Sequence, residues 1–276
     1  MGITPVEVQV LSCPPLNMIR KLTEKDRRAV IDFAYRREKE NLFVLGSFQR
    51  YKKPFAANYL AGAFRGKNLT GLAIFFKVYE SFVVNSYHKN DIADLVDHVV
   101  KAGAKIMHVP CFKKYGDAII RRLTKHHFKP KCVRDSLVFI LDKKDFHDFS
   151  DRPAAVAKRS DVGELATIHF PGKPRSWGKR IDYKNTFVYR RDGKIISTAN
   201  VHGASKNYFQ IGGVHTLEKY RNQGFAKKVI SGLCRHYFRK GKKYALLFMD
   251  KNNKPANKVY RKIGFKPKDK FVLAEY

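Results

Sequence analysis

The hydrophobic pattern of the chain switches between helical and extended spacing, and the same series of switches occurs twice. In the first half, VVKAGAKIMHVP combines an apolar-striped helix, a glycine suited to a helix C-terminus and a short strand. YFRKGKKYALLFM repeats this arrangement in the second half. The two glycines, Gly103 and Gly241, are separated by nearly the same interval as two copies of Phe-Lys-Pro-Lys, which begin at Phe128 and Phe265. The pattern therefore predicts an internal repeat.

The surroundings of the two Phe-Lys-Pro-Lys sites agree with this prediction. Each site follows a basic amphipathic segment, AIIRRLTKHH or NKVYRKIG, and precedes an alternating stretch typical of a strand, SLVFILD or FVLAEY. Capping-box patterns begin a helix early in each half, Thr23 with Asp26 and Asp161 with Glu164. We therefore expect two tandem copies of one α/β unit, residues 1–150 and 151–276, joined near the polar stretch Asp148–Pro153.

The composition fits a folded protein outside the membrane. Hydrophobic residues make up 44% of the 276 residues, which is ample for buried cores. The N-terminus lacks the pattern of a signal peptide, and no apolar run approaches the roughly 20 residues that span a bilayer. These observations predict a cytoplasmic protein with no membrane partner. The cysteines are scattered and predict reduced packing thiols without a metal site: Cys13, Cys111, Cys132 and Cys234.

The charge of the chain is strongly positive. Lys and Arg number 56 against 24 Asp and Glu, which gives a formal net charge of +32. Such a field attracts nucleic acid, phosphorylated ligands or acidic proteins. A lysine-rich proteome produces the same excess without any such partner, so the charge alone does not identify one.

The two copies differ most at one predicted turn. The second copy has RNQGFA, Arg221–Ala226, between a predicted strand at Phe209–Thr216 and a predicted helix, whereas the matching part of the first copy has no glycine. Backbone N–H groups at a glycine-containing turn can surround an anion, and the following helix N-terminus adds partial positive charge. The loop suits a pyrophosphate, and an ordinary structural turn is the alternative.

A tyrosine accompanies this loop. Downstream, Asn253 follows a predicted strand, Ala256 lies in a predicted helix, and Tyr260 follows within the same helix. The position opposite Tyr260 in the first copy is Leu123. A hydroxyl found only in the copy with the glycine loop suggests a role beside that loop, and simple packing of the ring is the alternative.

Together, the strand IGGVHT, the loop RNQGFA and the segment from Asn253 to Phe265 resemble, in order and spacing, the central motifs of the GNAT superfamily of acetyl-CoA-dependent N-acetyltransferases. The resemblance covers about residues 153–276, and the first half resembles a degenerate GNAT-like unit without the cofactor loop. It implies an α/β (α+β) fold of two tandem units, with mixed, mostly antiparallel sheets and helices on both faces. Asp192-Gly193, a type I′ hairpin signal, independently supports antiparallel strands.

The resemblance also implies a reaction and its residues. The protein is expected to be an acyltransferase in which an amine attacks the thioester of acetyl-CoA directly, with Tyr260 protonating the departing thiolate. Backbone amides of one strand would hold the pantetheine arm, those of the loop would surround the pyrophosphate, and an asparagine would bond the arm. The implied cofactor-binding residues are Val214, His215, Thr216, Arg221, Asn222, Gln223, Gly224, Phe225, Ala226, Lys227 and Asn253.

The resemblance leaves the general base and the acceptor open. Where many members carry a glutamate, this chain has Gln210, with His202 and His215 nearby in sequence. The acceptor amine is unknown; if the basic surface is selected, an acidic protein or an RNA-bound amine is favoured over a polyamine, which the charge would repel. The alternative function is that of a basic nucleic-acid-associated binding protein whose acetyl-CoA site is structural or sensory.

Overall fold

The computed structural model describes residues 18–152 and 155–276, so Cys13 and Pro153 lie outside the described residues. Its first half alternates helices and strands in the order that the repeat predicts. In chain order its elements are β1 (Met18–Lys21), α1 (Arg27–Arg36), α2 (Leu42–Arg50), α3 (Pro54–Ala57), β2 (Asn58–Arg65), β3 (Asn68–Phe76), β4 (Ser81–Ser86), α4 (Lys89–Lys101), β5 (His108–Phe112), α5 (Lys113–Lys125) and β6 (Cys132–Asp142).

The second half repeats the same series. Its elements are β7 (Ala155–Val156), α6 (Val162–His169), a 3-10 helix (Arg175–Arg180), β8 (Thr186–Arg191), β9 (Lys194–Ala204), β10 (Tyr208–Thr216), α7 (Phe225–Arg239), β11 (Tyr244–Asp250), α8 (Lys254–Ile263) and β12 (Lys266–Glu275). Other short 3-10 turns lie at Glu24–Asp26, Lys143–Asp145, Arg159–Asp161, Tyr183–Asn185 and Glu218–Tyr220.

All of these strands form one sheet in the order β1-β2-β3-β4-β5-β12-β6-β11-β10-β9-β8-β7. The order is symmetric about its centre, because each strand of the first copy lies as far from one edge as its counterpart lies from the other. Its pairs are antiparallel except β4 with β5 and β10 with β11. Helices cover both faces: α4 and α5 pack on one face of the first copy, and α1 and α2 pack on the other.

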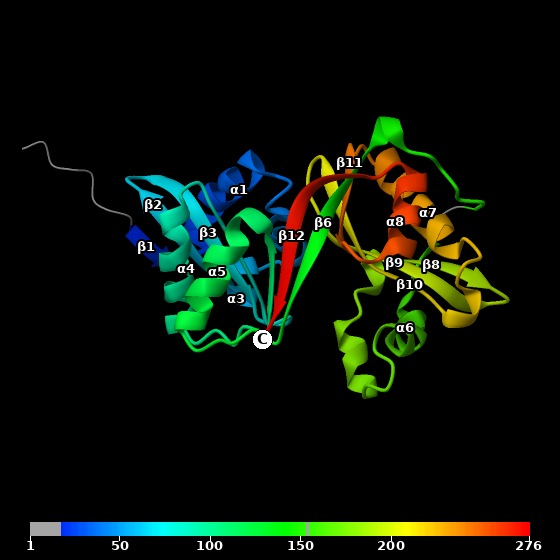
Figure 1. Ribbon diagram of the computed structural model, residues 1–276, viewed down its shortest axis with the longest axis horizontal. Helices are drawn as coiled ribbons and strands as arrows, with labels where there is room; N and C mark the ends of the chain where they lie inside the picture. The colour runs from blue at the N-terminus through cyan, green and yellow to red at the C-terminus, as the bar shows by residue number, and fades with distance from the viewer. Residues whose placement is uncertain (1–17, 153–154) are drawn as a thin grey trace, which may run out of the picture.

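The copies exchange their last strands. Strand β6 of the first copy pairs with β11, strand β12 of the second copy pairs with β5, and the two exchanged strands pair with each other. Figure 1 shows β6 and β12 side by side where the two lobes meet. The apolar cores follow the exchange, since Phe271 and Val272 belong to the core of the first copy and Phe139 to that of the second. The division of the sequence at residue 150 stays a prediction about repeat units, because each half of the single sheet contains a strand from the other unit.

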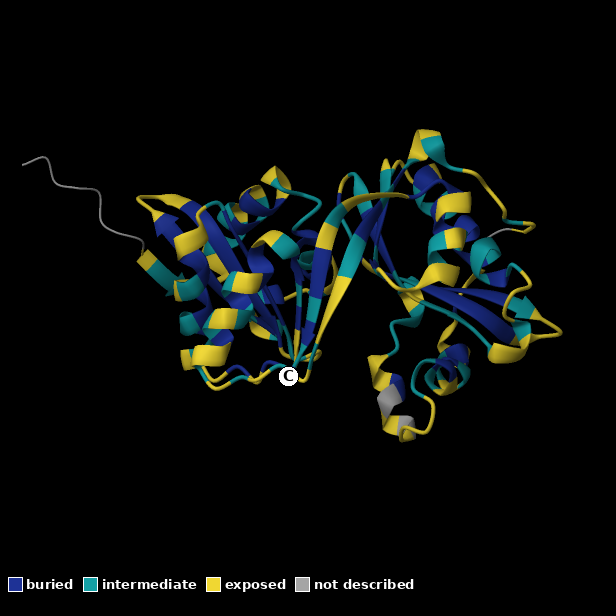
Figure 2. Ribbon diagram, in the orientation of Figure 1, coloured by how far each residue is buried: buried dark blue, intermediate teal, exposed yellow. Residues whose placement is uncertain are grey.

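A second contact joins the copies through α2 and β9. A Cβ added at Gly46 would lie 2.7 Å from the Cα of Gly203, and one added at Gly203 would lie 2.6 Å from the carbonyl oxygen of Leu42. Only glycine permits this approach of two backbones. The contact places the end of α2 against the sheet of the second copy. Figure 2 shows buried strands between helices with exposed outer faces in both lobes.

Several local predictions are confirmed. The Thr23 N–H donates to the Asp26 carboxylate at 2.9 Å, as a capping box requires. Asp192 and Gly193 have φ of 50° and 75°, the signature of a type I′ turn between β8 and β9. Gly103 and Gly241 both end a helix in the left-handed conformation, with φ of 81° and 84°.

The predicted pairing of Asp161 with Glu164 is wrong. The Asp161 carboxylate accepts from the Lys158 N–H at 2.7 Å, which caps the preceding 3-10 turn. Glu164 instead accepts from the Ile195 N–H at 2.7 Å and so ties α6 to β9. Because the 3-10 turn precedes α6, the capped end is at Lys158, three residues before Asp161. Glu164 is therefore not needed for capping and makes a tertiary contact.

Candidate active site

The site begins where the sheet splays in the second copy. Tyr208–Ile211 of β10 pair in parallel with Tyr244–Leu247 of β11. Both strands continue beyond these residues but no longer pair with each other. A bulge between Gly212 and His215 bends β10 away at this point, and Gly213 there has a φ of 55°. The β11 side of Val214, His215 and Thr216 is therefore left without a neighbouring strand, and their backbone faces a gap that a ligand can enter.

The glycine loop lies at the far end of the same strand. Gly224 is the N-cap of α7 and has a φ of 81°, and Asn222 is also left-handed with a φ of 62°. No atom of the described residues lies within 4 Å of a Cβ added at Gly224, so that position opens onto free space. Left-handed residues just before a long helix turn backbone N–H groups outward, which suits an anion.

A groove of about 940 Å³ joins the splayed strand, the loop and α8. The predicted cofactor residues that line it are Val214, His215, Thr216, Arg221, Asn222, Gly224, Phe225, Ala226, Lys227 and Asn253. Gln223 is the exception, because its side-chain amide donates to the carbonyl of Lys219 at 3.1 Å and does not line the groove. The structure thus brings together nearly all of the residues that the sequence motifs select.

Tyr260 and Asn253 close one side of this groove from α8. The Tyr260 ring packs against Phe139 and Phe265, with centroids 6.4 and 5.7 Å apart, and only 8% of the residue is exposed. Burial raises the pKa of Tyr260 to about 12, so its hydroxyl keeps its proton at neutral pH. The Asn253 side-chain oxygen accepts from the Ala256 N–H at 3.0 Å and caps α8. Its amide group can then donate into the groove.

The sequence motifs did not reveal the basic stripe of α8. Lys254, Lys258 and Lys262 line the groove and recur every four residues, so they lie along one face of the helix. With Arg221 and Lys227 they face a groove in which no lining side chain among the described residues is acidic. A ligand carrying several phosphates would meet favourable charge along this wall. The spacing of the lysines was visible in the sequence.

The first copy has a carboxylate where the second has its loop. Strand β4 ends at Ser86 and α4 begins almost at once, with Asp91 in its first turn. Asp91 is fully buried, and its carboxylate lies 2.9 Å from the Ser86 hydroxyl, 3.2 Å from the Thr70 hydroxyl and 3.5 Å from Arg65. A buried anion of the chain itself therefore occupies the N-terminal end of α4.

Replacing Asp91 with alanine is expected to destabilise the protein by about 2–4 kcal/mol, because two buried hydroxyls lose a charged acceptor. Urea unfolding followed by circular dichroism measures this change. Asp94→Ala, an exposed position on the same helix, is the matched control and should change stability by less than about 0.5 kcal/mol. Equal effects of the two variants would contradict a structural role for the Asp91 carboxylate.

Three histidines surround the bulge of β10. His215 lines the groove beside α8, whereas His202 and His169 of α6 line a second cavity. The ring centroid of His169 lies 6.3 Å from that of His215. Burial lowers the pKa of His169 and His215, so the neutral form of each ring predominates at pH 7, whereas His202 is exposed to solvent. Gln210 is buried and lines neither cavity. His169 was absent from the residues that the sequence selected, because its own segment carries no motif.

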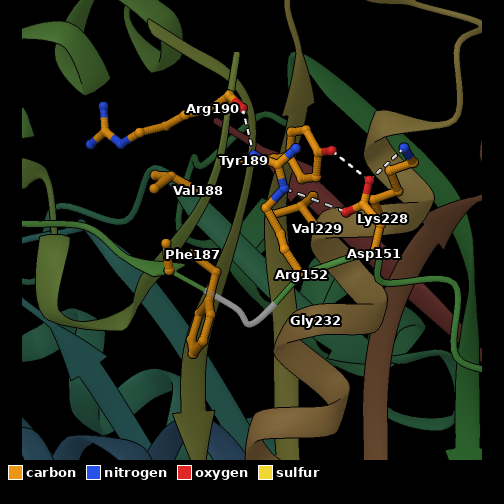
Figure 3. A pocket seen from close by; sticks show the side chains of 10 residues that line it. Asp151, Arg152, Phe187, Val188, Tyr189, Arg190, Lys228, Val229 and Gly232 are labelled. Atoms are coloured by element: carbon orange, nitrogen blue, oxygen red, sulfur yellow. Dashed lines mark hydrogen bonds and ion pairs between the residues drawn. The ribbon is translucent and has the colours of Figure 1, made fainter. Parts of the chain in front are cut away.

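A small cavity of about 150 Å³ lies on the other side of α7 (Figure 3). There the Tyr189 hydroxyl and the Lys228 ammonium each donate to the Asp151 carboxylate at 2.7 Å. The hydrogen bond to Asp151 raises the pKa of Lys228. Lys228 is thus held away from the groove, and its neighbour Lys227 is the lysine of α7 that lines it.

Comparison with known proteins agrees with this geometry. Residues 159–265 match the model of the acetyltransferase (GNAT) family. No curated protein matches the chain. Among the described residues, no helix is long and apolar enough to cross a membrane.

Solved structures match nearly the full length of the chain. A GNAT-family acetyltransferase from Colwellia psychrerythraea is 16% identical with a TM-score of 0.57, and the match covers 94% of this chain and 99% of that one. A tandem GNAT protein from the clavulanic acid biosynthesis pathway is 12% identical with a TM-score of 0.62, covering 95% and 98%. A Drosophila protein is 10% identical with a TM-score of 0.69, covering 94% and 99%. At such identities these structures establish the fold. The fold of the chain is therefore that of a tandem GNAT protein, and the second copy, which holds the groove, contains the segment that matches the acetyltransferase (GNAT) family.

Proposed function

We propose that the protein is an acetyl-CoA-dependent N-acetyltransferase with one cofactor site, in the second copy. The observation that carries the proposal is the groove, since a splayed strand, a left-handed glycine loop and a basic helix line one continuous space. Each part suits one portion of the cofactor: the strand suits the pantetheine amides, the loop the pyrophosphate, and the lysines of α8 the remaining phosphate.

The reaction needs few groups from the protein. Acetyl-CoA, when bound, supplies an activated acetyl group as a thioester. The backbone of Val214–Thr216 would hold the arm and orient the carbonyl, and the Asn253 amide would add a further donor. Tyr260 would hold a proton at its hydroxyl for the departing sulfur. Positioning the two reactants then supplies much of the rate enhancement.

Calorimetric titration of the full chain with acetyl-CoA is expected to give one bound cofactor per chain. The buried Asp91 carboxylate repels a phosphate from the first copy, so only the second copy should bind. A stoichiometry of two, or no binding at all, would contradict the proposal.

The nucleic-acid-associated alternative also stays a prediction, and gel-shift titration with single- and double-stranded nucleic acid in 50 and 200 mM salt tests it. A phosphate-driven complex should weaken steeply between these two conditions.

A further inference from the structure

A second cavity, of about 450 Å³, lies between the two copies. The first copy contributes Phe43 and Arg50 from α2 and Phe76 and Tyr79 from the region around β3, and the second contributes Phe170 from the end of α6. Aromatic and other apolar side chains therefore form much of its walls, beside two arginines and an aspartate. The close contact of Gly46 with Gly203 holds α2 at this position. Neither copy could form the cavity alone.

This cavity and the cofactor groove meet at the bulge of β10. Gly213 lines the cavity, and the next residue, Val214, lines the groove. The strand β10 is proposed to hold the thioester. A molecule in the cavity would therefore reach this strand from the side opposite the cofactor. This is the approach that a nucleophile needs.

An unpaired acceptor marks the same point. The residue Asn200 lines the cavity, and its side-chain oxygen is buried beneath that wall with no hydrogen-bond partner among residues 18–152 and 155–276. The amide nitrogen of Asn200 lies against Gly213, since a Cβ added at Gly213 would be only 2.6 Å from it. A buried carbonyl oxygen without a donor costs free energy, so the site favours a ligand that brings an N–H.

A hydrogen-bond network connects His169 to the bulge of β10. The Thr198 hydroxyl donates to the carbonyl of Gly213 at 3.3 Å and lies 3.2 Å from Nε2 of His169. We assign the hydroxyl proton of Thr198 to the Gly213 carbonyl, which makes the Thr198 oxygen the acceptor and His169 Nε2 the donor. Nδ1 then carries the lone pair and can accept a proton. Thr198 is fully buried, which makes this chain of hydrogen bonds rigid.

The charges in the cavity disfavour a second ammonium group. Asp182 is the one acidic residue among the described residues of the lining, and it pairs with Arg50 at 2.8 Å and accepts from Asn185 at 2.9 Å. Arg180 adds another positive charge. A polyamine entering with one amine at Asn200 would have to place its other ammonium groups among aromatic rings and arginines. A molecule with a single amine on an apolar body places no second ammonium group among the aromatic rings or beside the arginines.

We propose that this cavity is the acceptor site for a small primary amine with one nitrogen and an aromatic-sized apolar body. The inference rests on the proposed function. Asn200 would accept an N–H of the neutral amine, whose nitrogen attacks the thioester carbon. The C–N bond forms as the C–S bond breaks, Nδ1 of His169 takes the proton lost by nitrogen, and Tyr260 gives a proton to sulfur. An amide and free coenzyme A result, and the proton on His169 returns through solvent to Tyr260.

The test uses the full chain, with 2-phenylethylamine, spermidine and an acidic lysine-containing peptide as acceptors. Coenzyme A release is followed with a thiol reagent after acetyl-CoA binding has been measured by calorimetry. We expect 2-phenylethylamine to be acetylated with a kcat/KM at least about tenfold above that of the other two acceptors. Tyr79→Ala, which removes a ring of the wall, should raise the KM for the amine about tenfold while acetyl-CoA affinity is unchanged. Tyr35→Ala, an exposed aromatic of α1, is the control and should change neither value.

His169→Gln should lower kcat by about 100- to 10,000-fold with the amine KM little changed. In the unchanged protein, kcat should fall as pH falls through the lowered pKa of His169, because only the neutral ring accepts a proton. The variant should lose this acidic limb. Thr198→Val, which removes the hydroxyl that orients the ring, should lower kcat less and keep the limb. The titratable and charged described groups that face His169 or share its cavity are His108, His202, His215, Arg50, Arg180, Asp182, Tyr51 and Tyr79.

The possible failures are distinct. If acetyl-CoA binds but spermidine or the peptide is the better acceptor, the acceptor site proposed here is wrong and the proposed function stands. Loss of the acidic limb in His202→Gln rather than in His169→Gln would overturn the role given to His169. Absence of acetyl-CoA binding would overturn the proposed function, and this inference with it.

Discussion

Tyr260→Phe is expected to lower the rate of acetyl transfer by about 100- to 10,000-fold while acetyl-CoA affinity stays the same. Burial raises the pKa of Tyr260 to about 12, so the hydroxyl is protonated at neutral pH and can serve the departing sulfur as a proton donor. The substitution removes only that hydroxyl. The ring contacts with Phe139 and Phe265 stay, so the fold should be unchanged.

The internal repeat supplies evidence that the position tolerates an apolar residue. Leu123 occupies the matching site on α5 and is fully buried. The measurements are acetyl transfer to the best acceptor, acetyl-CoA affinity by calorimetry and thermal unfolding, for both proteins. Unchanged turnover would return Tyr260 to a packing role, and weakened affinity with normal turnover of bound cofactor would make it a binding residue.

Gly224→Val is expected to eliminate measurable acetyl-CoA binding. A valine side chain would project into the free space at the N-terminus of α7, where the pyrophosphate is proposed to lie. Each hydrogen bond to a charged group contributes about 1.5–3 kcal/mol, so losing two of them weakens binding by roughly 100-fold or more. The φ of 81° adds backbone strain for a β-branched residue.

Strain and exclusion can be separated with a control at the other end of the same helix. Gly241 follows α7 with a φ of 84°, and no described atom lies within 4 Å of a Cβ added there. Gly241→Val should therefore lose a similar stability, about 1–2 kcal/mol, and bind acetyl-CoA normally. If the two variants bind the cofactor equally well, the loop does not form part of the site.

The parts of the site that could be predicted are those written in local sequence. The loop around Gly224, the hairpin at Asp192-Gly193 and the positions of Asn253 and Tyr260 each depend on a few adjacent residues with distinctive chemistry. The structure places the loop, Asn253 and Tyr260 along one groove and the hairpin between β8 and β9. Their roles toward acetyl-CoA stay predictions until binding is measured.

What could not be predicted depends on pairing between distant segments. The strands SLVFILD and FVLAEY have similar alternation, so either fits the vacant edge of either unit, and the sequence does not say which unit receives which strand. The cavity between the copies depends on that choice. His169 and Asn200 carry no motif and acquire meaning only when the bulge of β10 brings them together.

Because β6 and β12 are exchanged, the first copy is synthesised well before the strand that completes its part of the sheet. Domains usually fold as units while the ribosome is still translating the rest of the chain, at about 5–20 residues per second. Here β5 has no native neighbour on its outer side until translation has passed residue 275. During that interval the nascent chain presents an open strand edge, the kind of surface that pairs with other chains. The time needed to translate the second copy therefore sets how long the edge of β5 stays without its native partner.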